Sequence, residues 1–477
     1  MKDTIEATIR QILQCNYNDC AKSLYQEGKI LELVATFANE MMDQNSVAVK
    51  GSLSWADKVK YGHELLDIEI PEGTDLSILL PKQHPTGVRS EEEIVEDALA
   101  HPIGAGLLAE EIHAGDTVCI LTNDITRLTR SHIYIPILVR ELNKAGVPDG
   151  DITILFANGM HSAMTEEQMC SLITEDIYRR ITVVQHDCEE SPCQLVGTTS
   201  YGHEVWANKI AMAADKLILT GGILVHHMAG FGGGRKDIIP GCARKDTILS
   251  NHKMVIDPNA QAGVLENNPV HLDFMEACAF THPAYLLNVI CDDHGMIYHA
   301  VAGHWREAYL HGAELAKDFY LYPIPERPDI VIASCGGFPK DIDLRQSKKG
   351  FYNASRAVKK GGVIICLAEC PEGCSKEMDD PFEEWLGRYP DKDSVVAELK
   401  RKVNMGGLNC YKVRECQAHC RLILITALDQ KRMAEVNVEC YPKEQLNEVI
   451  RTVLAEYDHP KVLYMPQATL TLPLVKE

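Results

Sequence analysis

The stretch KLILTGGILVHHMAGFGGGRK, residues 216–236, joins an apolar run to a glycine-rich turn that ends in two cations. The apolar half extends to Val225 and ends on His226 and His227. An apolar run bounded by glycines predicts a buried strand of a parallel sheet. In such sheets ligands bind beyond the carboxyl ends of the strands, so this turn is predicted to lie at a binding site.

Similar strand patterns surround this stretch on both sides. Apolar runs rich in β-forming residues occur at Thr117–Leu121, Ile152–Phe156, Ile181–Val184, Tyr285–Ile290 and Met296–Val301. Helical patterns separate several of them, notably Ser131–Ala145 and Thr165–Leu172. This alternation predicts an α/β fold with mainly parallel sheets and covering helices.

The length of 477 residues predicts more than one domain, because domains commonly hold ~100–200 residues. Prolines 323, 325 and 328 follow a helical pattern and mark the predicted linker. Beyond it, strand patterns at Asp329–Ala333, Val363–Leu367 and Leu422–Thr426 alternate with helical patterns at Ser347–Val358, Ser394–Val403 and Lys443–Tyr457. We therefore expect a helical extension at 1–45, a catalytic α/β domain at 46–322 and a smaller α/β domain at 323–477.

Composition excludes some classes of partner. The net charge of −21 opposes binding to a nucleic-acid backbone, and no apolar run reaches the ~20 residues needed to cross a membrane. No secretory segment is visible, and the 17 cysteines are spread through predicted core elements. We expect a cytoplasmic protein with reduced thiols.

The turn at 230–236 fits neither of the common phosphate-binding motifs. A Walker A loop ends in Gly-Lys-Ser/Thr, and the dinucleotide fingerprint needs a different glycine spacing. Gly232, Gly233 and Gly234 permit positive φ and let backbone amides approach an anion. A flexible turn with two solvated cations is the alternative interpretation.

Polar residues of complementary chemistry follow several predicted strands. His226 ends one apolar run, His161 follows another, and Asp124 and Arg127 follow a third, while His252 lies beyond the glycine turn. Histidine exchanges protons near neutral pH, and arginine pairs with carboxylates. Each residue alone is more often structural. Together they indicate acid/base chemistry on a small anion, with or without a metal.

These residues resemble the nickel-pincer lactate racemase family from about residue 60 to the C-terminus. The longest matching segment runs from Ala213 through His226 to Pro240. The shorter matching segments are Asp124-Ile-Thr-Arg127, Gly159-Met-His161, Asn251-His252, and Pro339–Asp343 with Gln346 and Lys349. The resemblance implies a racemase or epimerase of a 2-hydroxy acid. It also implies a cofactor, a pyridinium mononucleotide that grips nickel through carbon and two sulfurs.

The resemblance assigns roles to individual residues. Lys236 is expected to attach the cofactor covalently and His252 to bind nickel, with His161 and His226 as the paired catalytic bases. The glycines at 232–234 and Asp124 are expected around the cofactor.

Arg127, Gln346 and Lys349 are expected to hold the substrate, which puts the active site in the cleft between the two domains. Cofactor-biosynthesis proteins are expected partners, and protein from a host without them would lack the cofactor. Whether the protein forms a homo-oligomer stays open. The extension at 1–45 is expected to pack on the rest of the protein or on a second subunit.

The sequence departs from the family at three positions. Val225 stands where a proline is common, Gly232 where a serine is common, and Arg345 where many relatives have tyrosine. If Arg345 faces the pocket, it could pair with a second carboxylate or a polar tail of the substrate; the alternative is an outward-facing side chain. Two other classes stay open, a zinc-type hydrolase that uses the same histidines and a non-catalytic nucleotide-binding relative.

Overall fold

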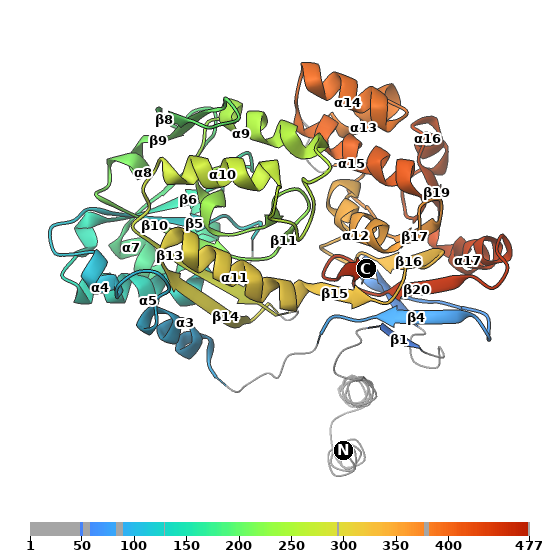
Figure 1. Ribbon diagram of the computed structural model, residues 1–477, viewed down its shortest axis with the longest axis horizontal. Coiled ribbons are helices and arrows are strands. Elements are labelled where there is room, and N and C mark those ends of the chain that lie inside the picture. The colour runs from blue at the N-terminus through green and yellow to red at the C-terminus, as the bar shows by residue number, and fades with distance from the viewer. Residues whose placement is uncertain are drawn as a thin grey trace, which may run out of the picture.

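The computed structural model describes residues 48–50, 58–82, 89–127, 129–292, 295–375 and 381–475. The helices expected at 1–45 lie outside these residues. The described chain forms two α/β lobes that lie side by side (Figure 1). We call residues 89–320 the first lobe, and residues 48–82 with 321–475 the second lobe.

The sheet of the first lobe has six strands, and all the predicted ones are confirmed. Their order is β14 (Ile297–Gly303), β13 (Tyr285–Cys291), β10 (Lys216–Gly222), β5 (Val118–Asn123), β6 (Ile152–Ala157) and β7 (Thr182–Gln185). Every neighbouring pair is parallel except β13 with β14. The carboxyl ends of β5, β6 and β10 therefore lie at the same edge of the sheet.

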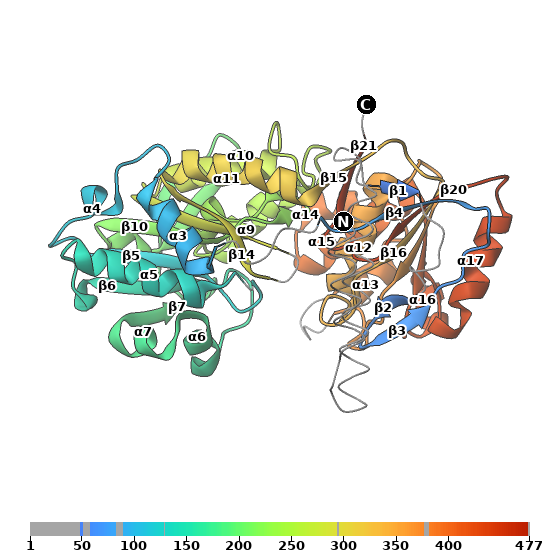
Figure 2. The ribbon, with the colours of Figure 1, turned by 90° about the horizontal axis from the view of Figure 1, so that it is seen from below.

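Helices bury both faces of this sheet. In β5, Leu121 packs into one hydrophobic cluster while Ile120 packs into the other, because successive side chains of a strand point to opposite faces. Helices α10 (Pro269–Ala279) and α11 (Trp305–Tyr320) cover one face, and α3 (Glu91–Ala100) and α5 (Ser131–Lys144) cover the other (Figure 2). This burial on both sides explains the nearly continuous apolar runs in the sequence.

Shorter elements complete the first lobe. They are α4 (Leu108–Glu111), α6 (Glu166–Ile173), α7 (Glu175–Arg180), the hairpin β8 (Cys193–Thr198) with β9 (Glu204–Asn208), α8 (Lys209–Ala213), and α9 (Lys245–His252). Thr165 caps α6 in a capping box with Gln168, as the sequence of that helix start predicts. No helix of the described ranges is long and apolar enough to cross a bilayer.

The second lobe contains a seven-stranded sheet in which only β1 runs antiparallel to its neighbour. Its order is β1 (Ala48–Lys50), β4 (Asp75–Leu79), β20 (Lys461–Met465), β16 (Ile330–Ser334), β17 (Val363–Leu367), β18 (Arg421–Ile425) and β19 (Glu439–Tyr441). Its helices are α12 (Leu344–Ala357), α13 (Phe382–Arg388), α14 (Lys392–Arg401), α15 (Met405–His419), α16 (Gln430–Glu435) and α17 (Leu446–Ala455), and a hairpin joins β2 (Lys58–Tyr61) to β3 (Glu64–Asp67).

The structure corrects the predicted domain boundary. We expected residues 46–322 in one domain, but β1 and β4 belong to the sheet of the second lobe, where β4 pairs in parallel with β20 near the C-terminus (Figure 1). Consecutive elements are usually neighbours in space, which favoured the wrong assignment. No local pattern in the short strand β4 encodes a partner so distant along the chain.

The predicted proline linker is a strand in the structure. Residues Leu321–Ile324 form β15, which pairs in parallel with β21, Leu472–Val475. Pro323 lies opposite Leu474 in this two-stranded sheet. Proline is tolerated at an edge position because the N–H that it lacks is not needed there to pair with another strand.

A buried arginine organises the glycine-rich turn. After β10 the chain forms β11 (Val225–His226) and β12 (Gly230–Phe231), which pair antiparallel, and then the 3₁₀ turn Gly234–Asp237. The Arg235 side chain is 0 % exposed and stacks on the Tyr309 ring at 4.1 Å. Its guanidinium donates hydrogen bonds of 3.0–3.2 Å to the carbonyls of Ala229, Phe231, Gly232 and Gly233. The interpretation as a turn with two solvated cations is therefore wrong for Arg235.

Two of the glycines are required by this packing. Gly233 has φ +79° and Gly234 has φ +48°, a region that disfavours residues with a side chain. A Cβ on Gly233 would lie 2.6 Å from Oδ1 of Asn288, and one on Gly234 would lie 2.9 Å from Cδ1 of Leu286. These glycines therefore let the turn pack against β13.

We predict that Arg235→Leu lowers the free energy of unfolding by about 3 kcal/mol or more, measured by urea denaturation. The reason is that each buried carbonyl left without a donor costs about 1–3 kcal/mol. Arg244→Leu is the matched control, because Arg244 stacks on Trp206 at 4.2 Å but is partly exposed. It should cost only about 0.5–1 kcal/mol. Equal losses in the two variants would contradict a special role for Arg235.

Candidate active site

A cavity of about 560 Å³ is lined by residues from both lobes. The first lobe contributes the segments that follow β5, β6 and β10, together with α9, and the second lobe contributes Arg345, Pro381 and the segment 402–405. The structure brings most of the predicted site residues to this cavity: Asp124, Arg127, His161, His226, Gly232, Gly233, Lys236, His252 and Arg345. Gly234, Gln346 and Lys349 are not part of its lining.

His161 is oriented by a buried carboxylate. Asp124 follows β5 directly and is 3 % exposed, and its Oδ2 lies 2.9 Å from Nδ1 of His161. Burial raises the pKa of Asp124, but hydrogen bonds from His161 and Thr126 outweigh it and hold the pKa below its ordinary value. The ionised carboxylate favours a proton on Nδ1 of His161, which leaves Nε2 as the basic nitrogen.

His226 lies in β11 and its ring stacks on that of His227, with centroids 4.7 Å apart. Burial lowers the pKa of His226 well below its ordinary value. His226 is therefore neutral at neutral pH and able to accept a proton.

The surroundings of Lys236 favour the neutral form of its amine. It lies in the 3₁₀ turn after the glycines, and burial lowers the pKa of its amine well below the ordinary value. The charges of Arg127 and Arg235 act in the same direction. A neutral amine is nucleophilic, so this lysine is poised to form a covalent bond.

His252 is the last residue of α9 and is 8 % exposed. Burial lowers its pKa to about 3, against an opposing interaction with the Ile248 carbonyl. Its Nδ1 is buried without a hydrogen bond of normal geometry. A neutral imidazole at the wall of a cavity is suited to donate a lone pair to a metal ion.

The first turn of α12 adds positive charge from the second lobe. Asp343 caps this helix by accepting a hydrogen bond of 2.6 Å from the amide of Gln346. Arg345 lines the cavity, so the outward-facing alternative does not hold. Lys349 donates to Oε1 of Gln346 at 2.9 Å. Its side chain keeps contact with solvent, yet surrounding protein atoms, then Arg127 and Arg345, lower its pKa to about 8.

One residue of the cavity was missed by the sequence analysis. Asp237 follows Lys236, is 1 % exposed and accepts a hydrogen bond of 3.2 Å from Nδ2 of Asn123. Burial raises its pKa well above the ordinary value, which favours the protonated carboxyl group beside the lysine. Its position next to Lys236 was the available signal, but only the fold shows that the carboxyl is buried.

Comparisons with known families agree with this site. The model of the lactate racemase N-terminal domain matches residues 61–263, and that of the lactate racemase C-terminal domain matches residues 325–450. The first match contains every predicted site residue of the first lobe, and the second contains those of α12. The model named regulatory protein PchR N-terminal domain matches residues 2–53.

Similar proteins carry the same family name. A lactate racemase of Thermoanaerobacterium thermosaccharolyticum is 37 % identical over 347 residues, which are 72 % of this chain and 80 % of that protein. A lactate racemase of Lactiplantibacillus plantarum is 35 % identical over 305 residues, 62 % of this chain and 72 % of that protein.

Similar solved structures also include a lactate racemase. The lactate racemase apoprotein of T. thermosaccharolyticum superposes with a TM-score of 0.78 at 30 % identity, covering 88 % of this chain and 99 % of that one. A Thermotoga maritima protein shares the fold, with a TM-score of 0.62 at 19 % identity over 81 % of this chain and 98 % of its own. The chain described here therefore belongs to the lactate racemase family and is an isomerase.

Proposed function

We propose that this enzyme inverts the C2 centre of a 2-hydroxy acid with a nickel-pincer nucleotide tethered to Lys236. The observation that carries the proposal is the meeting of four groups in one cavity. They are the amine of Lys236 and the imidazoles of His161, His226 and His252. The surroundings of Lys236, His226 and His252 favour the uncharged form that each proposed role needs.

The residues of the cavity fit the proposed cofactor. An amine must be neutral to bond to a carboxyl-derived carbon, and the surroundings of Lys236 favour that form. No group of three or more His, Cys, Asp or Glu side chains converges to hold a metal within the described ranges. A single histidine ligand suits a metal that is already coordinated by an organic group. When bound, the cofactor supplies a reversible hydride acceptor, through which C2 becomes planar.

The two imidazoles serve the two stereoisomers. The hydroxyl group of each isomer takes a different position when its carboxylate and C2 are fixed, so two bases are needed. His161, oriented by Asp124, accepts the hydroxyl proton of one isomer at Nε2, and His226 accepts that of the other. Arg127 binds the substrate carboxylate through its planar guanidinium.

Gln346 and Lys349 complete the substrate site from the second lobe. In the present arrangement they bond to each other beside the cavity. The proximity of Lys349 to Arg127 and Arg345 is reflected in its lowered pKa. A substrate carboxylate would relieve this repulsion between cations, so substrate binding favours closure of the cleft. The free thiols of the described cysteines suit the reducing cytoplasm as the compartment.

The two alternative functions have weaker support. A zinc hydrolase needs three protein ligands around its metal, and it gives no role to the neutral Lys236. A non-catalytic nucleotide-binding relative would not require the pair formed by Asp124 and His161. Metal analysis with intact mass separates the three functions: nickel with an adduct, zinc without one, or neither.

We predict that Lys236→Ala abolishes the covalent adduct, as measured by the intact mass of protein loaded with cofactor. Lys402→Ala is the control, because Lys402 lines the same cavity from the second lobe. The control should keep the adduct. An adduct on the Lys236→Ala protein would refute the assignment of Lys236 as the residue that binds the cofactor covalently.

We predict that His161→Ala and His226→Ala each block inversion while the adduct mass persists. Asp124→Asn should lower kcat with little effect on KM, since the amide no longer favours a proton on Nδ1 of His161. Chiral chromatography of the product measures inversion. Unimpaired racemisation by either histidine variant would refute its role as a required base.

Arg345 bears on the identity of the substrate. The relatives are named for lactate, whereas here a guanidinium lines the cavity and favours an acid with a second anionic or polar group. We predict that Arg345→Tyr shifts preference toward small monocarboxylates, measured as relative kcat/KM over a panel of chiral 2-hydroxy acids. Unchanged ratios over the panel would reject this idea.

A further inference from the structure

Two consecutive residues of α9 contact two consecutive residues of α10. Asn251 is 0 % exposed, and its side-chain amide donates hydrogen bonds to Oδ2 of Asp273 at 2.8 Å and to the Val270 carbonyl at 3.2 Å. The ring of the next residue, His252, packs against Phe274 with centroids 6.3 Å apart. The side chain before the histidine is therefore fixed to the same helix that supports its ring.

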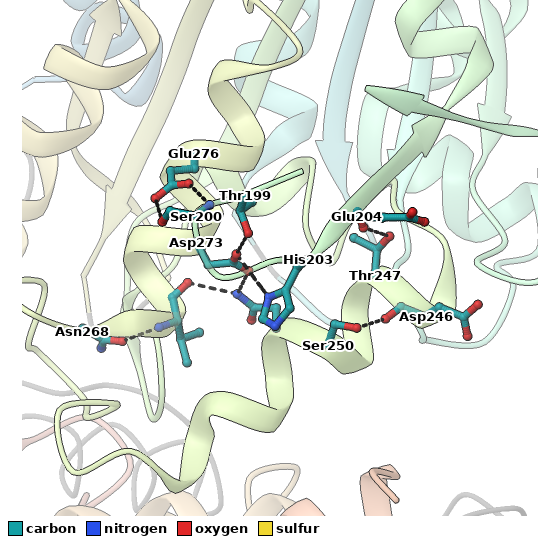
Figure 3. Close-up of polar contacts among 12 residues, drawn as sticks. Thr199, Ser200, His203, Glu204, Asp246, Thr247, Ser250, Asn268, Asp273 and Glu276 are labelled. Carbon is teal, nitrogen blue, oxygen red and sulfur yellow. Dashed lines mark hydrogen bonds and ion pairs between the residues drawn. The ribbon is translucent and has the colours of Figure 1, made fainter. Parts of the chain in front are cut away.

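Asp273 is itself fixed by the turn between β8 and β9. It is 0 % exposed, and it accepts a hydrogen bond of 2.6 Å from Oγ1 of Thr199, while Nδ1 of His203 lies 3.3 Å from each of its oxygens. Figure 3 shows Asp273 between Thr199 and His203. A buried carboxyl group is costly unless it is hydrogen-bonded, and these donors together with Asn251 set its orientation.

The orientation of the His252 imidazole depends on contacts with neighbouring residues. Metal-binding histidines usually donate their second N–H to a carboxylate or carbonyl, which fixes the ring. In this chain Nδ1 of His252 is buried without a hydrogen bond of normal geometry. In addition, His252 ends α9, and the 3₁₀ turn Lys253–Ile256 follows directly. Besides the interaction with the Ile248 carbonyl, the ring is therefore held by its packing against Phe274 and by the hydrogen bonds that anchor Asn251, the residue before it.

We propose that Asp273 is a positioning residue that acts through Asn251 to set the orientation of the His252 imidazole. The inference rests on the proposed function, in which His252 binds nickel. Asp273 does not line the cavity and has no part in the proposed proton transfers. Its function is to transmit the position of the β8–β9 turn to the metal ligand.

The chain offers a matched control on the same helix. Glu276 lies about one turn after Asp273 in α10 and accepts hydrogen bonds from the backbone N–H and Oγ of Ser200, at 2.6 and 2.5 Å. Ser200 belongs to the same turn as Thr199 (Figure 3). Glu276 thus joins the same helix to the same turn, but its hydrogen bonds run to Ser200 and not to Asn251. Glu276→Gln is the same chemical change as Asp273→Asn.

The test compares these two variants in the full-length protein. The first readout is the ¹⁵N imidazole signals of His252 in the apoprotein, assigned by their loss in His252→Gln. The second is nickel per chain after cofactor loading, with the adduct at Lys236 followed by intact mass. We expect Asp273→Asn to shift the His252 signals and to lower nickel affinity on the order of 10- to 100-fold, with the adduct kept. Glu276→Gln should match the wild type in both readouts.

Unchanged His252 signals and nickel content in Asp273→Asn would overturn the inference, as would equal changes in Glu276→Gln. If Asp273→Asn does not fold, Asn251→Leu replaces it, because that change leaves Asp273 bonded to Thr199 and His203. Wild-type behaviour of Asn251→Leu would also overturn the inference. If the wild-type chain forms no adduct, the proposed function fails. The ¹⁵N signals of His252 still decide whether Asp273 determines the orientation of the imidazole.

Discussion

The active-site architecture depends on one buried guanidinium. Arg235 satisfies four backbone carbonyls of the segment 229–233 and stacks on Tyr309, and so it holds the glycine-rich turn in a single conformation. On one side of this segment lies His226 and on the other Lys236. Because both neighbours are anchored by the same turn, their separation is set by the packing of an arginine that never reaches the cavity.

Electrostatics within the cavity then decides the chemical state of these groups. The protein as a whole carries a net charge of −21, yet Arg127, Lys236 and Arg345 all line this one cavity. Cations that are close together and partly removed from water oppose one another's charge. Burial is the main cause that lowers the pKa values of Lys236, His226 and His252, which favours their neutral forms, while arginine keeps its proton under these conditions. The same surroundings therefore suit the proposed roles of Lys236 as the tether, His226 as a base and His252 as the nickel ligand.

The two lobes contribute different residues to the site. The first lobe carries the proposed tether and bases in the segments that follow β6 and β10, and the proposed nickel ligand at the end of α9. The second lobe presents the first turn of α12, from which Arg345 lines the cavity. Chain segments from both ends of the sequence form the second sheet, since β4 pairs with β20. The second lobe is consequently tied together independently of the first.

The sequence alone determined the α/β class, the six strands of the first lobe and the cluster of candidate residues, because apolar periodicity and strand-end position are local properties. Family resemblance separated the roles of Lys236, His252 and the two catalytic histidines. Only the tertiary structure placed β1 and β4 in the second lobe, since strand pairing across most of the chain has no local signature. It also decided that Arg235 and Asp237 are buried and that the pKa of Asp237 is raised, because burial and the charges around a group depend on how distant segments pack.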